Sequence, residues 1–481
     1  MNPAAVPRPF EDDAHLSRYR YSWPTDEFSV RDGWETLPGG DARVRHLPEP
    51  TEQVAQDSRW PAFFPSPIAL VTTGDGEHTA LEKVVGASIV NRFPYVVAVS
   101  FCRETLSPRH YARHRFMTML ESTGAAAVQF IAPGEALDSA MNAVATLPDS
   151  KAHARMASTG LPFRRAATSA APVFASSYMV YEARLARPGV DFEGERIFDR
   201  PWVDVGSHRI YFLEITAIQL REDIADGRSQ VQWRSLPAWR PQEPLRHASN
   251  GDSRGVQLGE SGQYVKPYTP HYRFPTVDTA GFEPDVRRNG MAIKFLPPLP
   301  AEQVEIDNDR ARWPCFFPSS VGMITSWAPG GIPNLMPCGS TTIVSRQPLV
   351  VAPSVSYAAI NDRYAKRASL DIIRQKGRFG CGVPFIDDLV LGGIKYAGNV
   401  SLARNARKVA DAGFEVEPSE WSPVLTALPV HFDCQIVGEV RLGTHIMFLG
   451  EVKRIRVRAD VAPDNPIEWC PWAQVASRVE G

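Results

Sequence analysis

The sequence lacks the features that mark several large classes of protein. Its six cysteines lie far apart, with no CxxC pair and no histidine spacing typical of zinc, so we expect reduced thiols in the core and no metal site. Acidic and basic residues nearly balance at a formal charge of −2, and the basic ones are scattered, which argues against a nucleic-acid partner. No stretch reaches the roughly 18 uninterrupted apolar residues of a membrane span, and the N-terminus has no signal-peptide core. We therefore expect a cytoplasmic protein with no membrane partner.

What the sequence has in quantity is proline and glycine. The 42 prolines and 34 glycines favour a β-rich, loop-heavy architecture over a helical one. With 481 residues, 43% of them hydrophobic, the chain is long enough to build two or three domains.

The chain repeats itself. The segment RWPAFFPSPIALVTT from Arg59 returns as RWPCFFPSSVGMITS from Arg312, 253 residues later. IVNRFPYVVAVS from Ile89 likewise matches IVSRQPLVVAPS from Ile343. We infer two tandem copies of one module.

The end of the module repeats as well. GSHRIYFLEI from Gly206 matches GTHIMFLGEV from Gly443, so the first copy must contain an insertion, which we place at 188–204. Between the copies, the segment RHASNGDSRGVQLGESGQY is polar and rich in glycine and serine, as flexible linkers are. We predict an N-terminal domain over 1–245, a linker over 246–264 and a C-terminal domain over 265–481.

Each copy predicts the same order of elements. A strand, a turn, a strand rich in hydroxyl groups and a strongly apolar strand are followed by a helix that ends at Gly124 or Gly377, a further strand, a mixed helical region and a long hairpin. The hairpins pair 173–185 with 208–220, and 428–440 with 445–457. Because neither a GxGxxG motif nor a βαβ alternation is present, the pattern favours a mainly β, α+β barrel over a Rossmann fold.

The segment from Arg312 to Pro348 contains the candidate ligand-binding residues. An apolar strand, 321–325, leads through a Pro/Gly turn into a run of short polar residues. These residues are Asn334, Gly339, Ser340, Thr341, Thr342 and Ser345. Their hydroxyls and approachable backbone N–H groups suit a phosphate or a polar heteroaromatic ring, although the same residue types also simply form turns.

These motifs resemble the flavin reductase-like, FMN-binding split-barrel family. The second copy has Phe317-Pro318-Ser319, Pro333-Asn334, a closing Ser345 and the hairpin from Gly443 to Val452. The resemblance covers about 313–457 and, more weakly, 60–220. It implies two split barrels that form an internal pseudo-dimer, with FMN at their interface and NADH or NADPH as reductant.

The resemblance also assigns residues. Asn334, Gly339 to Thr342 and Ser345 would line the isoalloxazine and ribityl chain. Lys366, Arg367 and Ser369 would meet the phosphate, and two cations with a hydroxyl at a helix start suit that anion, although they equally suit a solvated helix face. His445, whose counterpart is His208, would face the flavin or the nicotinamide, or serve a structural role.

The first copy departs from the family pattern. It has Thr79 to Lys83 in place of Pro-Asn and Asn91 in place of the closing serine, while His114 and Phe116 replace Arg367 and Ser369. We therefore expect the first copy to bind FMN poorly and to complete the pocket of the second. His110 and His114 are four residues apart, but no third ligand is near them, so this pair does not indicate a metal.

Three functions are consistent with this sequence. The first is an NAD(P)H:flavin oxidoreductase that can supply reduced flavin to a partner monooxygenase. The second is a tailoring enzyme that keeps its FMN and acts on one small molecule, with aromatic residues of the flanks (18–50 and 265–299) as a lid. The third is a non-catalytic flavin-binding protein.

Overall fold

The computed structural model describes residues 35–36, 43–47, 69–84, 86–91, 94–102, 114–131, 135–147, 151–206, 208–221, 282–288, 291–296, 320–346, 348–358, 366–384 and 388–458. The predicted linker and most of both aromatic flanks lie outside these ranges. No helix in the described part is both long and apolar enough to cross a lipid bilayer.

The second half folds into a closed barrel of six antiparallel strands. In barrel order the strands are β24 (His445–Arg458), β19 (Leu349–Ser356), β18 (Ile332–Arg346), β17 (Ser320–Ala328), β20 (Arg378–Val383) and β23 (Val430–Arg441). Pairing of β23 with β24 closes the ring. The predicted turn is the short 3-10 segment Pro329–Gly331, where Gly330 has a φ of 78° that favours glycine.

The first half repeats this arrangement with one break. Its sheet runs β4 (Thr79–Val84), β3 (Ala69–Gly74), β7 (Ala125–Ile131), β10 (Ser177–Leu185), β14 (His208–Arg221), β6 (Val96–Cys102) and β5 (Ala87–Asn91). β4 and β5 follow one another in the chain and together correspond to the single strand β18. The mainly β prediction of two tandem barrels is confirmed.

Short helices cover the barrels. They are α2 (His114–Thr123), α3 (Glu135–Thr146) and α4 (Ala152–Ser158) in the first half, and α6 (Ala368–Lys376), α7 (Asp388–Asn399) and α8 (Lys408–Asp411) in the second. α2 and α6 are each followed by the predicted glycine, Gly124 with φ 67° and Gly377 with φ 65°. Each half also has a separate two-stranded sheet. These sheets are β8 (Phe163–Arg165) with β9 (Pro172–Phe174), and β21 (Val416–Glu417) with β22 (Val424–Leu425).

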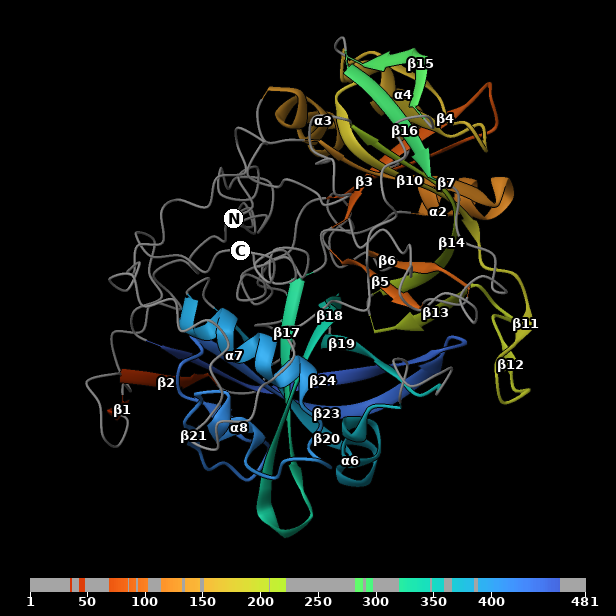
Figure 1. The fold of residues 1–481 in the computed structure, drawn as a ribbon. Helices are drawn as coiled ribbons and strands as arrows, with labels where there is room; N and C mark the ends of the chain where they lie inside the picture. The colour runs from red at the N-terminus through yellow and green to blue at the C-terminus, as the bar shows by residue number, and fades with distance from the viewer. Residues whose placement is uncertain are drawn as a thin grey trace, which may run out of the picture.

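The strands that precede each half pair with the other half, as Figure 1 shows. β2 (Arg43–Leu47), preceded by β1 (Glu35–Thr36), pairs with β24 of the second half, with Leu47 opposite Ile455. β16 (Met291–Leu296), preceded by β15 (Phe282–Arg288), pairs with β14 of the first half, with Leu296 opposite Ile218. The two halves therefore exchange their leading strands.

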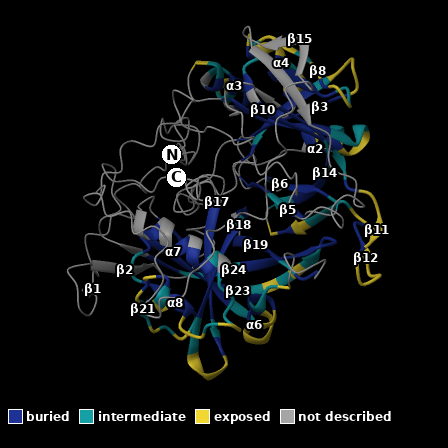
Figure 2. Ribbon diagram, viewed as in Figure 1, coloured by how far each residue is buried: buried dark blue, intermediate teal, exposed yellow. Residues whose placement is uncertain are grey.

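The buried residues lie inside the barrels and on the surface between them (Figure 2). One apolar cluster joins Val96 and Phe212 of the first half to Val350 and Met447 of the second. Two hydrogen bonds cross this surface in a nearly symmetric way, from Ser100 Oγ to the Val344 carbonyl at 2.6 Å and from Ser354 Oγ to the Val90 carbonyl at 2.5 Å. Burial of this apolar surface stabilises the paired arrangement.

The insertion of the first half forms a small hairpin of its own. Its strands are β11 (Gly189–Val190) and β12 (Arg196–Ile197), and β13 (Trp202–Val205) then pairs with β14. The insertion predicted at 188–204 thus supplies two of these strands and most of the third.

Candidate functional site

Predicted site residues from β18 and α6 meet in the second half. Asn334 Nδ2 lies 2.9 Å from Ser369 Oγ and 3.3 Å from Ser326 Oγ, and all three residues are buried. The strand places Asn334 on the barrel wall, and the first turn of α6 brings Ser369 against it. These two predicted residues are therefore neighbours, although they are 35 positions apart in the sequence.

Two cations lie near one another at the start of α6. Arg367 is the N-cap residue of α6, where its backbone N–H donates to the Ser356 carbonyl at 3.1 Å. Lys408 opens α8 and is 5% exposed, and no carboxylate pairs with its ammonium group in the described part of the chain. Burial and the nearby positive charge of Arg367 lower the pKa of Lys408 to about 7. An anion would stabilise this lysine in its charged form.

The remaining predicted residues differ in their surroundings. Thr341 and Thr342 are buried and contact backbone carbonyls, while Gly339 and Ser340 are partly exposed. Lys366 points outward to Asp371, with Nζ 2.8 Å from the carboxylate. The hydroxyl of Ser345 is fully buried and has no hydrogen-bond partner among the described residues. The structure does not test the roles assigned to these residues, which stay predictions.

The first half closes the equivalent place with its own side chains. Ala80 stands at the position of Asn334 in the strand register, and Phe116 stands at the position of Ser369. Phe116 is fully buried with its ring centroid 5.0 Å from that of Phe101, so the core fills the space that a hydroxyl would leave.

The first half also neutralises the buried cation. Counted from Gly160 and Gly413, Arg155 corresponds to Lys408. Arg155 Nη1 donates to Glu82 Oε2 at 2.6 Å, and its other nitrogens donate to the Leu147 carbonyl. Glu82 has Met336 as its counterpart in the second half. The first half therefore carries a carboxylate at the position where the second half has Met336.

His445 lies where the two halves meet. Its Nδ1 is 2.7 Å from Thr444 Oγ1, and the backbone N–H groups of both residues donate to Asn91 Oδ1 of the first half, at 2.9 and 3.1 Å. Thr444 Oγ1 also lies 2.9 Å from Asn91 Oδ1. The two halves therefore make a direct contact at the start of β24, and the completion of a flavin pocket there by the first copy stays a prediction.

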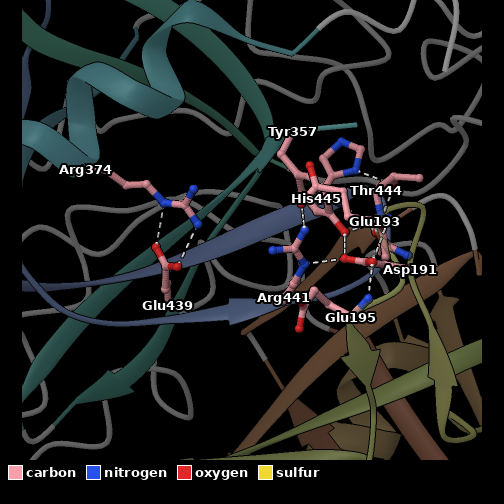
Figure 3. Close-up of polar contacts among 11 residues, drawn as sticks. Asp191, Glu193, Glu195, Tyr357, Arg374, Glu439, Arg441, Thr444 and His445 are labelled. Carbon is pink, nitrogen blue, oxygen red and sulfur yellow. Dashed lines mark hydrogen bonds and ion pairs between the residues drawn. The ribbon is translucent and has the colours of Figure 1, made fainter. Parts of the chain in front are cut away.

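A charged cluster lies beside this contact, as Figure 3 shows. Arg441 pairs with Asp191 and Glu193 of the inserted hairpin, and its guanidinium lies 4.4 Å from the centroid of the Tyr357 ring. The Tyr357 hydroxyl donates to Asp191 and also contacts the Gly443 carbonyl. Burial would raise the pKa of Asp191, but the hydrogen bonds from Tyr357 and Arg441 outweigh burial and lower it. The insertion therefore fastens the first half to the turn before His445.

Sequence reasoning missed Lys408 and the contacts of Asn91. Lys408 falls in a polar helical region with no motif, and only its alignment with Arg155 marks it. Asn91 was noted only as a departure from serine. The contacts of Asn91 form only when the second half folds against it, and no local sequence pattern predicts that.

The donor set of the second half fits a phosphate-bearing ligand. The set comprises a buried lysine that pairs with no carboxylate among the described residues, an arginine at a helix start, a serine hydroxyl and an asparagine amide, all of which can bind phosphate oxygens. The orphaned hydroxyl of Ser345 is a further buried group available to a polar ligand.

Comparison with known proteins agrees with the repeat. The family model described as "Flavin reductase like domain" matches the chain twice, over 62–237 and 314–473. A search of curated protein sequences finds no match.

Solved structures give partial likenesses. The flavoredoxin from Methanosarcina acetivorans is 19% identical over 32% of this chain and 75% of its own, with a TM-score of 0.27. The flavoredoxin of Desulfovibrio vulgaris (Miyazaki F) is 21% identical over 32% and 76%, also with a TM-score of 0.27. Nitrilotriacetate monooxygenase component B from Bacillus cereus is 18% identical over 29% and 69%, with a TM-score of 0.25.

Proposed function

The chain belongs to the flavin reductase-like family, and from this premise we propose that it is an FMN-dependent oxidoreductase with one working flavin site, in the second half. The observation that carries the proposal is the contrast between Lys408, a buried lysine with no carboxylate partner in the described part of the chain, and Arg155, its counterpart, which is paired with Glu82. A buried cation without an anion is costly unless a ligand supplies the anion.

Each part of the second site has a role in this proposal. Lys408, Arg367 and Ser369 would hold the phosphate, with charge-assisted bonds from the two cations. Asn334, the run Gly339 to Thr342 and Ser345 would line the ribityl chain and the ring. Lys366 would contribute only if it left Asp371, so we assign it a minor part.

The redox chemistry comes from the cofactor. A bound FMN would supply an isoalloxazine ring able to accept a hydride from NADH or NADPH. The protein orients the two rings and excludes water, and His445 would contact the nicotinamide or the flavin. The electrons would go to a partner monooxygenase or to a bound small molecule.

Flavin counting tests the proposal. The purified chain is loaded with FMN and dialysed, the flavin per chain is measured by absorbance, and NADH or NADPH is then added without oxygen. We expect one FMN per chain and bleaching by the nicotinamide. Lys408→Met should bind FMN at least tenfold more weakly, whereas Lys376→Met, on the exposed last turn of α6, should bind as the unaltered chain does. Two flavins per chain, or unchanged binding by Lys408→Met, would contradict the proposed site.

Retention of the flavin distinguishes the two enzyme functions. Reduced flavin that exchanges with solution supports supply to a partner monooxygenase. One retained equivalent supports action on a bound small molecule. A loaded protein that neither nicotinamide bleaches would contradict the reductase activity.

A further inference from the structure

The amide of Asn91 has a fixed orientation. Its Nδ2 donates to the Pro94 carbonyl at 2.8 Å, and its Oδ1 faces two backbone N–H groups, those of Thr444 and His445. A rotated amide would set its NH2 group against those two donors and its oxygen against a carbonyl. Oδ1 is therefore the atom that faces the second half, and it can only accept hydrogen bonds.

This orientation decides the direction of the next two bonds. Thr444 Oγ1 lies 2.9 Å from Asn91 Oδ1, so its single proton donates to that oxygen. The same Oγ1 lies 2.7 Å from His445 Nδ1. Because the proton of Thr444 is already used, the threonine oxygen accepts, and Nδ1 of the imidazole must carry a proton.

We propose that Asn91 of the first half is a positioning residue that, through Thr444, holds neutral His445 in the tautomer with its proton on Nδ1. In this tautomer Nε2 is the acceptor nitrogen. If the nicotinamide binds beside His445 as proposed, its carboxamide N–H is a group from which Nε2 can accept, whereas Nε2 cannot donate to a carbonyl oxygen of the flavin. The catalytic consequence rests on the proposed function, but the tautomer itself does not.

Among the described residues, the repeat has no matching contact on the opposite side of the surface between the halves. Ser345 is the counterpart of Asn91 in the repeat, and its buried hydroxyl finds no partner in the described ranges. Elsewhere the surface is nearly two-fold, as the matched bonds of Ser100 and Ser354 show. The departure from symmetry thus falls on the residue that orders His445.

The tautomer can be observed directly. The FMN-loaded chain is labelled with ¹⁵N-histidine, long-range ¹H–¹⁵N spectra are recorded at pH 8, and His445 is assigned by its loss in His445→Gln. We expect a protonated-type shift for Nδ1 and an unprotonated-type shift for Nε2. Asn91→Ala and Thr444→Val should both move His445 toward the Nε2–H tautomer that predominates in free histidine. Asn91→Asp, which keeps the acceptor oxygen, should retain the Nδ1–H form.

A control separates this role from simple adhesion between the halves. Ser100→Ala also removes a hydrogen bond across the surface, but it should leave the shifts of His445 unchanged. If Asn91→Ala does not fold, Thr444→Val tests the same relay from within the second half. An Nε2–H tautomer in the unaltered chain, or identical shifts in a folded Asn91→Ala or Thr444→Val variant, would overturn the proposal.

Kinetics connect the tautomer to the reaction. If the chain reduces flavin as proposed, Asn91→Ala should raise KM for the nicotinamide several-fold, with a smaller effect on kcat and unchanged FMN content. A lowered kcat with unchanged KM would overturn the link to the nicotinamide. A chain without reductase activity would contradict the proposed function and leave the tautomer result standing.

Discussion

Glu82 and Arg155 form a buried ion pair, 2.6 Å apart, at the place in the first half where the second half has Met336 and Lys408. Both side chains of the pair are 1% exposed. Since the two halves share one fold, this pair is the clearest chemical difference between them. The difference is the physical basis for the proposal that only the second half binds an anion.

Removing the carboxylate alone should be costly. In Glu82→Met, Arg155 is left buried with only carbonyl partners, and we expect the free energy of unfolding to fall by about 3–5 kcal/mol. Chemical denaturation followed by fluorescence measures the change. The double variant Glu82→Met/Arg155→Met removes both charges and should recover most of the loss. Equal loss in the single and double variants would contradict a strong pairing.

Flavin affinity should depend on pH because of Lys408. Its pKa is lowered to about 7, so above pH 7 the free site holds mostly neutral lysine, and binding of a phosphate must take up a proton. The dissociation constant for FMN should therefore rise with pH, by up to about tenfold per pH unit, until the pH reaches the higher pKa that Lys408 has in the bound state.

Titrations of FMN binding between pH 6.5 and 9.5 test this prediction, because the phosphate itself stays mostly dianionic over that range. Lys408→Arg keeps its charge over this range and should give a flat profile. A flat profile in the unaltered chain would show that Lys408 does not meet the phosphate.

The fold was largely predictable because its signals are local. The apolar strand at 321–325, the Pro/Gly turn after it and the helix stops at Gly124 and Gly377 all depend on neighbours in the chain, and the structure confirms them. The exchange of leading strands was not predicted, because the sequence of a strand such as β2 does not determine which barrel edge the strand will pair with.

The site was predictable only in part, for the same reason. Asn334 and Ser369 were predicted from the family resemblance, and the structure places them side by side, while their role in binding flavin stays a prediction. Lys408 was missed because its burial, and not its neighbours in the sequence, makes it unusual. The contact of Asn91 with Thr444 spans 353 positions and exists only once both barrels have docked.

The inserted hairpin should contribute to the docking of the halves. Asp191→Asn removes the charge that faces Arg441, and we expect the free energy of unfolding to fall by about 1–3 kcal/mol, since this pair is partly buried. The lowered pKa of Asp191 means that its contribution is present above pH 3.8 and is lost as the pH falls through the lowered value. Thermal unfolding at pH 7 and in acid measures both effects. Asp199→Asn is the matched control, because its pair with Arg196 in the same insertion is exposed and should contribute less than about 0.5 kcal/mol.

The surface between the halves has little room at Gly86. A methyl group at this position would lie 2.5 Å from the Ile343 carbonyl oxygen of the second half, and backbone cannot move aside as a side chain can. Gly86→Ala should therefore push β5 away from β18 and lower the free energy of unfolding by about 1–3 kcal/mol. Because β18 carries Thr342 and Ser345, FMN retention should fall as well, although Gly86 lies in the half without the proposed site.

Gly438→Ala is the matched control, since its methyl would meet only Leu449 Cδ1 at an ordinary 3.4 Å. Thermal unfolding and flavin content, measured on both variants, test the prediction. Full flavin retention in a destabilised Gly86→Ala protein would show that the proposed site does not depend on how the halves fit together.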